Sequence, residues 1–436
     1  MNQFAKRRKK LLEQITDGAI VIAAGHSGNR NNDVDHEFRQ QSPFWYMTGF
    51  GEPDAVAVLR PGHDEPYTLF VLPRDPRTET WTGLRVGVDG AKETHGADVA
   101  LPTTELEKEL PKLLEQSDNI YYSIGTDQKL DRLMTDLIVQ RRKTSQRGEK
   151  HIAAFIDPLP VIDRMRLIKS DSEIASLQKA IDITAAGFSV AMREARPGAF
   201  EYEVQAGMET RFRHAGSPRN GYPSIVASGG NACILHYISN RSQLKDGQLL
   251  LVDAGAEHDY YSADITRTWP VSGKFSPEQR DVYEIVLAAN EAGIAAAKPG
   301  AGIDEIHNSA LRVLVQGLVD LGTLEGELDG LIETRDYLPY YMHGTSHWLG
   351  LDVHDSGIYR TGGTTGPATN IEPGMVFTVE PGLYFGPFAE NAPERLKGIG
   401  VRTEDDLVVT ESGPRNMTAA VPKSVADIEA AAGHGF

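Results

Sequence analysis

The first third of the chain alternates between short apolar runs and amphipathic stretches. Runs rich in β-branched and aromatic residues predict short strands, and they cover residues 18–24, 44–50, 55–59, 67–72 and 119–124. Apolar residues recur with helical spacing over 104–115 and 128–142. This order of elements predicts an α/β layer.

A boundary between two domains is predicted near residues 160–168. The segment 141–150 before it is charged and uneven, and the Asp-Pro-Leu-Pro sequence that follows disfavours the continuation of a helix. A chain of 436 residues corresponds to two or three domains at roughly 150 residues each. We therefore expect an N-terminal domain over 1–165 and a second domain over 166–436.

The second domain is predicted to begin with a helix. Ser170 followed by Glu173 has the pattern of a capping box, and it predicts a helix that continues to Arg193. Further helices are predicted at 201–215, 277–298 and 302–321. Strands are predicted at 247–254, 260–270, 375–380 and 400–410.

Composition narrows the class of protein. Hydrophobic residues make up 40% of the chain and charged residues 24%, and the mean hydropathy is −0.34. These values are typical of ordinary globular proteins and exclude a fibrous, disordered or membrane-spanning chain. The formal net charge of −17 repels polyphosphates, so we expect no nucleic-acid partner.

The N-terminal sequence and the cysteine content bear on cellular location. Residues 6–10 are basic, but Glu13 and Asp17 interrupt any apolar run after them. Because no run approaches the roughly 18 apolar residues of a membrane helix, we expect neither export nor a membrane partner. The single cysteine, Cys233, excludes an internal disulfide and a four-cysteine zinc module. Together these features favour a cytoplasmic location.

One pair of carboxylates follows from two predicted strands. The run 249–252 is continuously apolar, should be buried on both faces, and is followed by Asp253. A tight hairpin centred between His258 and Asp259 would place Asp253 opposite Asp264, with Cβ atoms about 5 Å apart. Two acids that close repel each other unless they are protonated or bridged by cations. On spacing alone, one exposed acid and one capping acid remain an equal alternative.

A second pair of carboxylates lies in the C-terminal strands. Glu380 follows the apolar run 377–379, and strand alternation places Arg402 and Glu404 on one face. Between the two pairs, three of the 13 histidines lie within 12 residues of one another, namely His343, His347 and His354. Such a cluster indicates a candidate functional site rather than a chance group of surface residues.

Four carboxylates and one imidazole match two divalent cations in charge. Oxygen-rich sites with one nitrogen favour Mn²⁺ and tolerate Co²⁺, Zn²⁺ or Fe²⁺. Two such ions about 3.5–4 Å apart can hold a bridging hydroxide and polarise a carbonyl, which amide hydrolysis requires.

Other chemistries fit the sequence poorly. Gly344 stands where an H-E-x-x-H metalloprotease needs its glutamate, and no G-x-S-x-G elbow or Walker A loop occurs. Cys233 near His236 is a conceivable nucleophile, but a buried apolar role for the thiol is favoured.

Five separated motifs resemble those of the pita-bread metallopeptidases, and in particular the aminopeptidase P family. They stand in the family's order and comprise Asp253-Ala254-Gly255, residues 263–268, 343–355, 378–384 and 398–406. Residues 44–50 and 166–170 also resemble the family's N-terminal domain and domain boundary. The resemblance implies an α/β N-terminal domain that closes the active-site mouth. It also implies an α+β C-terminal catalytic domain of the pita-bread (creatinase/aminopeptidase-like) type.

The resemblance also implies a role for each candidate residue. The implied metal ligands, with Asp264 and Glu404 bridging both ions, are Asp253, Asp264, His347, Glu380 and Glu404. Glu380 is further implied to relay protons, His354 to steady the carbonyl oxygen, and His236 to border the substrate. All of these are expectations from position in the motifs.

Recognition of proline is implied for three more residues. A prolyl nitrogen carries no hydrogen, so a site must recognise the ring by shape and the following carbonyl by charge. The residues that match the family's proline-side pocket are His343, Tyr384 and Arg402. Asp33 and Trp81 resemble residues near the mouth of the site.

The implied activity is that of an exopeptidase that releases the first residue of peptides with proline in second position. A prolidase, which cuts only Xaa-Pro dipeptides, is the alternative, although Ser346 and Trp348 favour the aminopeptidase. Methionine aminopeptidases usually lack the long N-terminal domain, and a metal-free binding scaffold is disfavoured because every ligand type is present. A homodimer or homotetramer is implied. The segment 141–150 departs from the family pattern, so a contribution of a neighbouring subunit to the site stays open.

Overall fold

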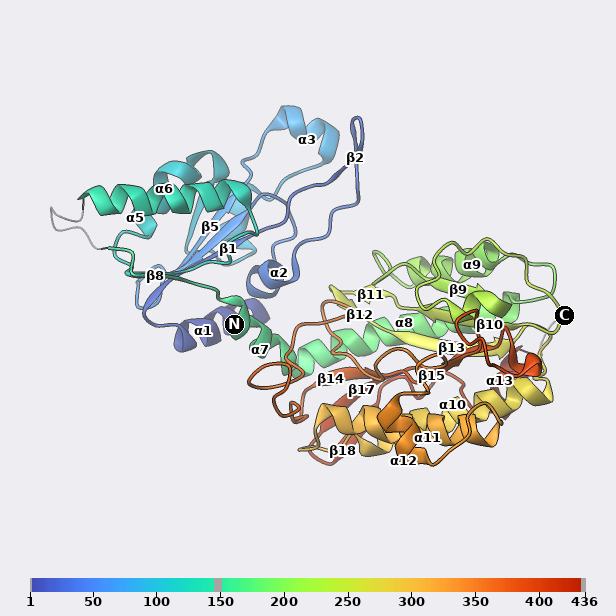
Figure 1. The fold of residues 1–436 in the computed structure, drawn as a ribbon. Helices are drawn as coiled ribbons and strands as arrows, with labels where there is room; N and C mark the ends of the chain where they lie inside the picture. The colour runs from blue at the N-terminus through green and yellow to red at the C-terminus, as the bar shows by residue number, and fades with distance from the viewer. Residues whose placement is uncertain (1, 145–150, 433–436) are drawn as a thin grey trace. The chain divides into compact units, whose positions relative to one another are not determined.

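The chain divides into two compact units in the computed structural model, which describes residues 2–144 and 151–432. The units are Met1–Met165 and Arg166–Phe436, and Figure 1 draws the first from blue to green and the second from green to red. Residues 145–150 of the charged segment lie outside the described residues. None of the described helices has the length and apolar content needed to span a membrane.

A mixed six-stranded sheet forms the centre of the first unit, with the order β6-β5-β4-β1-β7-β8. The inner strand β1 (Gly18–Ala23) pairs antiparallel with β4 (Val56–Leu59) and parallel with β7 (Asn119–Tyr121). The sheet is completed by β5 (Tyr67–Val71), β6 (Val99–Pro102) and β8 (Ala154–Ile156). A separate exposed hairpin comprises β2 (Asn29–Asn31) and β3 (Val34–Asp35).

Helices pack against this sheet, as the predicted α/β layer requires. Leu110 and Met134, from two different helices, are buried in one core cluster with Val21 of β1. The helices of this part of the chain are α1 (Gln3–Gln14), α2 (Ser42–Thr48), α3 (Pro76–Thr82), α4 (Gly87–Glu93), the 3₁₀ turn η1 (Thr103–Glu105), α5 (Leu106–Leu113), α6 (Gln128–Thr144) and α7 (Leu159–Leu167).

The strand predicted over residues 44–50 is wrong, because α2 covers most of this segment. Pro43 lies at the start of α2, where its missing N–H costs nothing, and Gly49 ends the helix with a φ of 65°. Phe44 to Thr48 are all buried. A short helix that is buried on every side lacks the polar positions that reveal a helical period, so its sequence looks like that of a buried strand.

The second unit contains two pairs of long helices with strands between them (Figure 1). Helix α8 (Asp171–Glu194) packs with α9 (Glu201–His214), and α10 (Pro277–Ala296) packs with α11 (Ile303–Asp320). The capping box predicted at Ser170 is confirmed, since the Ser170 N–H donates to Glu173 at 2.9 Å. The shorter helices are η3 (Gly229–Cys233), α12 (Leu328–Thr334), η4 (Glu394–Leu396) and α13 (Val425–Ala432).

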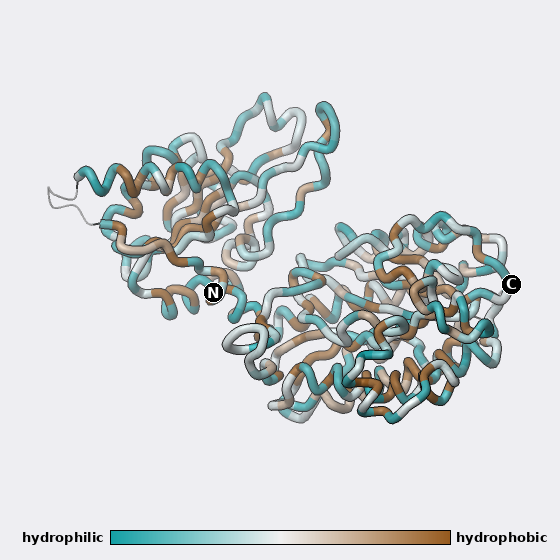
Figure 2. The backbone as a smooth tube through the Cα atoms, in the orientation of Figure 1, coloured by the Kyte–Doolittle hydropathy of each residue, from teal (hydrophilic) through white to brown (hydrophobic). Residues whose placement is uncertain are grey.

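The strands between these helices form small antiparallel sheets. One has the order β13-β10-β9, a second has the order β14-β17-β18, and two strand pairs complete the set. Their bounds are β9 (Ile225–Ser228), β10 (Leu249–Ala254), β11 (Glu257–His258), β12 (Tyr261–Ser262), β13 (Ile265–Pro270), β14 (Val376–Val379), β15 (Gly382–Tyr384), β16 (Gly400–Arg402), β17 (Asp405–Thr410) and β18 (Gly413–Asn416). In Figure 2 these strands include long brown, hydrophobic stretches, whereas the helices change colour along their length.

The hairpin register differs from the prediction by two residues. Its two-residue turn is Asp259-Tyr260, and the φ values of these residues are 48° and 68°. A type I′ hairpin turn requires a positive φ at both central residues. Asp253 therefore lies opposite Thr266, and Asp264 comes just before β13. A shift by two residues preserves the face of a strand. The two carboxylates consequently stay on one side, although they are not directly opposite.

Candidate active site

The candidate acids lie at or beside the ends of strands in the second unit. Asp253 is in β10 and Asp264 immediately precedes β13, while Glu380 follows β14. Glu404 lies in the break between β16 and β17, where an isolated bridge to Thr266 fixes its backbone. Strands of several small sheets therefore present carboxylates to one place.

A loop alongside β14 adds the imidazole. The Thr378 N–H donates to the carbonyl of His347 at 3.0 Å, and the Glu380 N–H donates to the carbonyl of Thr345 at 2.8 Å. These bonds hold the loop antiparallel to the strand, so that His347 and Glu380 are neighbours. Sequence alone indicated a histidine cluster, and the backbone pairing determines which histidine meets the acids.

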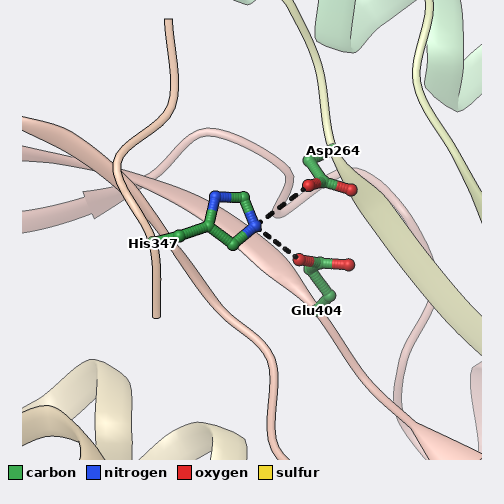
Figure 3. A group of neighbouring side chains, drawn as sticks. All are labelled: Asp264, His347 and Glu404. Carbon is green, nitrogen blue, oxygen red and sulfur yellow. Dashed lines mark ion pairs between the residues drawn. The ribbon is translucent and has the colours of Figure 1, made fainter. Parts of the chain in front are cut away.

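The His347 ring nitrogen Nε2 is at the centre of the cluster. It is 3.3 Å from Oδ2 of Asp264, 3.5 Å from Oε1 of Glu380 and 4.0 Å from Oε1 of Glu404. Figure 3 shows Asp264 and Glu404 facing this nitrogen from two different segments of the chain. Possible ligand atoms of Asp264, His347 and Glu404 all lie within 4.8 Å of one another.

Burial makes the acid cluster electrostatically unfavourable without cations. Burial raises the pKa of Glu380 to about 7, although His347 opposes the shift. Burial and the neighbouring Asp264 and Glu380 raise the pKa of Glu404 well above its usual range. The pKa of Asp253 is raised by burial despite Arg402. Burial lowers the pKa of His347, but the hydrogen bond to Asp264 and the charge of Glu380 outweigh it and raise the pKa to about 9.

Divalent cations would relieve this repulsion, and the donor set suits them. Carboxylate oxygens with a single imidazole nitrogen are the ligands that Mn²⁺ and similar ions accept. Acids that close in a buried site need a positive counter-charge. The residues present therefore fit a divalent metal centre.

Two side chains that the sequence analysis did not single out contact the candidate ligands. The Tyr222 hydroxyl is 2.6 Å from Oδ1 of Asp253 and 2.5 Å from Oδ1 of Asp264. Thr266 donates its hydroxyl to Glu404 at 2.6 Å. Strand alternation could have found Thr266, which is two residues after Asp264. Tyr222 lies in a Gly-Tyr-Pro loop without periodic signal, so its place needed the tertiary structure.

A cavity of about 570 Å³ opens onto the acids. Its lining includes the predicted His236, His343, His354 and Arg402 together with the five candidate ligands. An apolar part of the wall is formed by Pro223, Ile225, Leu235, Ile238 and Val353. The cavity thus combines a charged floor with an apolar wall, as small-ligand sites commonly do.

Tyr384 supports two residues that line the cavity. It is 1% exposed, and its hydroxyl lies 2.8 Å from Nε2 of His343 and accepts a bond from Arg402 at 3.0 Å. Nδ1 of His343 lies 2.7 Å from the Gly344 carbonyl, which can only accept, so that nitrogen carries the hydrogen. Burial and Arg402 lower the pKa of His343 to about 3. His343 is therefore a neutral imidazole of fixed orientation.

His354 contacts the metal-site histidine directly. Its ring centroid is 4.5 Å from that of His347, with the rings at 78°. Burial and the nearby His347 lower the pKa of His354, so it is neutral at physiological pH. A neutral imidazole can donate one N–H to an acceptor in the cavity.

Two family models match the chain. Residues 175–411 match metallopeptidase family M24, and residues 4–121 match the aminopeptidase P N-terminal domain. The chain belongs to metallopeptidase family M24. Membership of this family makes the chain a metal-dependent peptidase, and it confirms the predicted resemblance to aminopeptidase P.

Relatives of this M24 peptidase are similar over its whole length. It is 44% identical to the Xaa-Pro aminopeptidase of Escherichia coli over 98% of this chain and 97% of that protein. It is 43% identical to the Xaa-Pro aminopeptidase of Haemophilus influenzae over 98% and 96% of the two chains.

Solved structures confirm the predicted fold class of the M24 peptidase. The aminopeptidase PepP of Pseudomonas aeruginosa superposes with a TM-score of 0.95 at 44% identity, over 98% of this chain and 97% of that one. A zinc-substituted E. coli aminopeptidase P in complex with product gives a TM-score of 0.94 at 44% identity, over 99% and 97% of the chains. The α/β N-terminal domain and the pita-bread catalytic domain are both present.

The remaining candidate residues of this M24 peptidase lie outside the acid cluster. Cys233 is buried, donates its thiol to the Ile399 carbonyl at 3.5 Å, and burial raises its pKa to about 12. Such a thiol is a poor nucleophile. Asp33 and Trp81 are exposed residues of the first unit, and Trp81 is 88% exposed.

Proposed function

We propose that this M24 peptidase is a Xaa-Pro aminopeptidase, which releases the first residue of peptides with proline in second position. The observation that carries the proposal is the cluster of three buried carboxylates, the half-buried Glu380 and His347 at the floor of an open cavity. Relatives at 43–44% identity over 98% of the chain are Xaa-Pro aminopeptidases, which points to the same activity.

Metal binding is assigned to the five clustered residues. Asp253, Asp264, His347, Glu380 and Glu404 would hold two divalent cations, and the oxygen-rich set favours Mn²⁺ while tolerating Co²⁺ or Zn²⁺. When bound, two such cations supply Lewis acidity toward the scissile carbonyl and lower the pKa of the attacking water.

Glu380 is proposed to move the proton. A carboxylate within hydrogen-bond reach of the attacking water can accept its proton and return it to the leaving nitrogen. The Glu380 side chain lines the cavity, where a substrate amide has access to it.

The neutral histidines are proposed to contact the reacting peptide. His354 can donate an N–H to the scissile carbonyl oxygen as negative charge develops on it. His236 lines the same cavity and would border the substrate beside the metal ligands.

Recognition of the proline side is assigned to His343, Arg402 and Tyr384. His343 offers a neutral ring face for the pyrrolidine, and Arg402 offers charge for the carbonyl that follows. Tyr384 holds both in place through its hydroxyl. Three expectations stay predictions: closure of the mouth by the N-terminal domain, assembly as a dimer or tetramer, and a cytoplasmic location.

The experiment that tests the proposal compares three peptides on chelator-stripped protein, with and without added Mn²⁺. We expect metal-dependent cleavage of an Xaa-Pro-Pro tripeptide and none of an Xaa-Ala-Pro control, in which proline is not second. Cleavage of an Xaa-Pro dipeptide alone would make the enzyme a prolidase. That alternative is not favoured, because the relatives at 43–44% identity are named aminopeptidases.

A further inference from the structure

Glu201 is a buried acid that the proposed chemistry does not use. It is the first residue of α9 and is 0% exposed. Its Oε1 accepts from the N–H and the hydroxyl of Ser228, both at 2.8 Å, and from the Asn231 amide at 2.9 Å. Its Oε2 accepts from the Tyr237 hydroxyl at 2.8 Å and the Ser242 N–H at 2.9 Å. One carboxylate thus gathers five donors.

This donor set requires a carboxylate rather than a carboxamide. The backbone N–H of Ser228 approaches one oxygen of Glu201 and the backbone N–H of Ser242 approaches the other. Both groups can only donate, so both side-chain oxygens must accept. A glutamine would turn an NH₂ group toward one of these N–H groups and leave a buried donor without its partner.

The donors come from both ends and from the middle of the segment that carries His236. Ser228 ends β9, Asn231 lies in η3, and Tyr237 and Ser242 follow. From Ile234 to Arg241 the chain is neither helix nor strand. Side-chain bonds therefore contribute much of what holds this loop in place.

The same loop forms part of the cavity wall. Leu235, His236 and Ile238 all line the cavity that contains the metal-site acids. Ile238 is 58% exposed, so little packing restrains it on its outer side. Asn240 anchors the far end, because its amide oxygen accepts from the Val226 N–H at 3.0 Å.

We propose that Glu201 is a positioning residue for the reaction, one that acts by holding the loop 229–242 so that Leu235, His236 and Ile238 face the metal site. The kinetic consequence of this inference rests on the proposed function. The hold of Glu201 on the loop, which we call the clamp, is independent of activity. Displacement of a substrate-bordering group by about 1 Å can lower catalysis by up to roughly a hundredfold.

The first test measures the loop directly. Hydrogen–deuterium exchange of the metal-loaded full chain is compared for wild type, Glu201→Gln and Glu203→Gln. Glu203 is the matched control, because it lies on the same helix and its carboxylate caps the exposed Phe200 N–H, outside the loop. We expect faster exchange across 229–242 in Glu201→Gln alone. Unchanged exchange would overturn the clamp.

The second test asks whether the clamp acts through His236. We expect kcat/KM on the Xaa-Pro-Pro tripeptide to fall on the order of tenfold in Glu201→Gln, with metal content unchanged. In a His236→Ala background the same substitution should cost less than about twofold. An equal loss in both backgrounds, or no loss in wild type, would overturn the role in the reaction.

A further variant keeps the proposal testable if Glu201→Gln does not fold. Tyr237→Phe removes one of the five donors and keeps the carboxylate, and we expect a smaller change in the same direction in both measurements. If it changes neither loop exchange nor kcat/KM, the proposal fails. Absence of cleavage by the wild type would instead reject the proposed function, and the exchange data would still decide whether Glu201 clamps the loop.

Discussion

The carboxyl group of Glu380 is held among other acids and beside His347, whose Nε2 is 3.5 Å away. Residue type and strand position were enough to mark Glu380 as a candidate, because an acid after an apolar strand is unusual. The raised pKa depends on burial and on two neighbouring acids, Asp264 and Asp253, that come from distant segments. Sequence spacing does not contain that information.

The pH dependence of stability follows from this shift in the metal-free protein. The pKa of Glu380 is raised from 4.5 to about 7 on folding, so the folded state binds the extra proton between these values. Stability should fall as pH rises through this window, by on the order of a few kcal/mol. This loss of stability is measured by thermal unfolding of chelator-stripped wild type and Glu380→Gln between pH 4.5 and 7.5. The variant should show a flatter profile, and equal slopes would contradict the assignment.

Replacement of Glu404 tests the proposed shared ligand. Glu404→Ala removes one carboxylate next to Asp264 and His347, so we expect bound metal to drop and kcat to fall far more than tenfold, which corresponds to about 1.4 kcal/mol. Metal analysis and kcat on the tripeptide are the measurements. Glu411→Ala, at an exposed position after β17, is the control and should match wild type. More than about a tenth of wild-type kcat in Glu404→Ala would contradict the role.

At the scale of elements, hairpin geometry decides how two candidate ligands meet. Gly255, between Asp253 and the turn, has no room for a side chain, since a Cβ there would lie 1.8 Å from the Ala263 carbonyl oxygen. The glycine therefore permits the close approach of the two chain segments that carry the acids.

Gly255→Ala should force these segments apart. We expect a loss of roughly 1–3 kcal/mol in unfolding free energy and weaker Mn²⁺ binding, measured by denaturant unfolding and calorimetry. Gly330→Ala, on α12 with open space at its Cβ, is the control and should be neutral or slightly stabilising. Wild-type metal affinity in Gly255→Ala would show that the acids tolerate the shift.

A buried ion-pair network fixes Asp355, the residue that follows His354. Asp355 is 7% exposed and accepts from Arg166 at 2.5 Å and from Lys169 at 3.0 Å. Burial raises the pKa of Asp355, but the two cations outweigh it and lower the pKa overall. The associated stability is present above the ordinary value of 3.8 and is lost as pH falls below it.

Asp355→Asn should destabilise the protein strongly. It leaves two buried cations without their full counter-charge, which typically costs about 3–5 kcal/mol. The control is Asp352→Asn, whose side chain is 41% exposed, so its pair with Arg166 should contribute about 0–1 kcal/mol. Denaturant unfolding at pH 7 compares the two. Equal losses would mean that burial does not set the strength of this network.

At the scale of the whole molecule, metal binding and stability are linked. A ligand that binds only the folded state stabilises it by about 2.7 kcal/mol at one hundred times its Kd. We expect Mn²⁺ to raise the melting temperature of chelator-stripped wild type. Calorimetry with and without Mn²⁺ is the measurement, and Glu404→Ala should lose most of the shift. A full shift in that variant would place the ion elsewhere.

The overall charge of −17 acts at the same scale. A strongly acidic chain favours association with cations and disfavours polyphosphate partners. In the second unit, four of its acids line one cavity, so part of this negative charge lies at the candidate metal site.

The sequence by itself determined most of the elements and the composition of the candidate site. Capping at Ser170, the periodic helices, and acids beside apolar strands are local patterns, and local patterns follow from side-chain chemistry and backbone preference. The recognised motifs, in the right order, identified the family.

Only the tertiary structure decided how these parts meet. The hairpin register depended on two positive φ values at Asp259 and Tyr260, and α2 formed where burial on every side concealed the helical period. Tyr222 and Glu201 found partners up to 42 positions away. Such partners are chosen by packing and by the need to satisfy buried polar groups, and neither is encoded in the spacing of neighbouring residues.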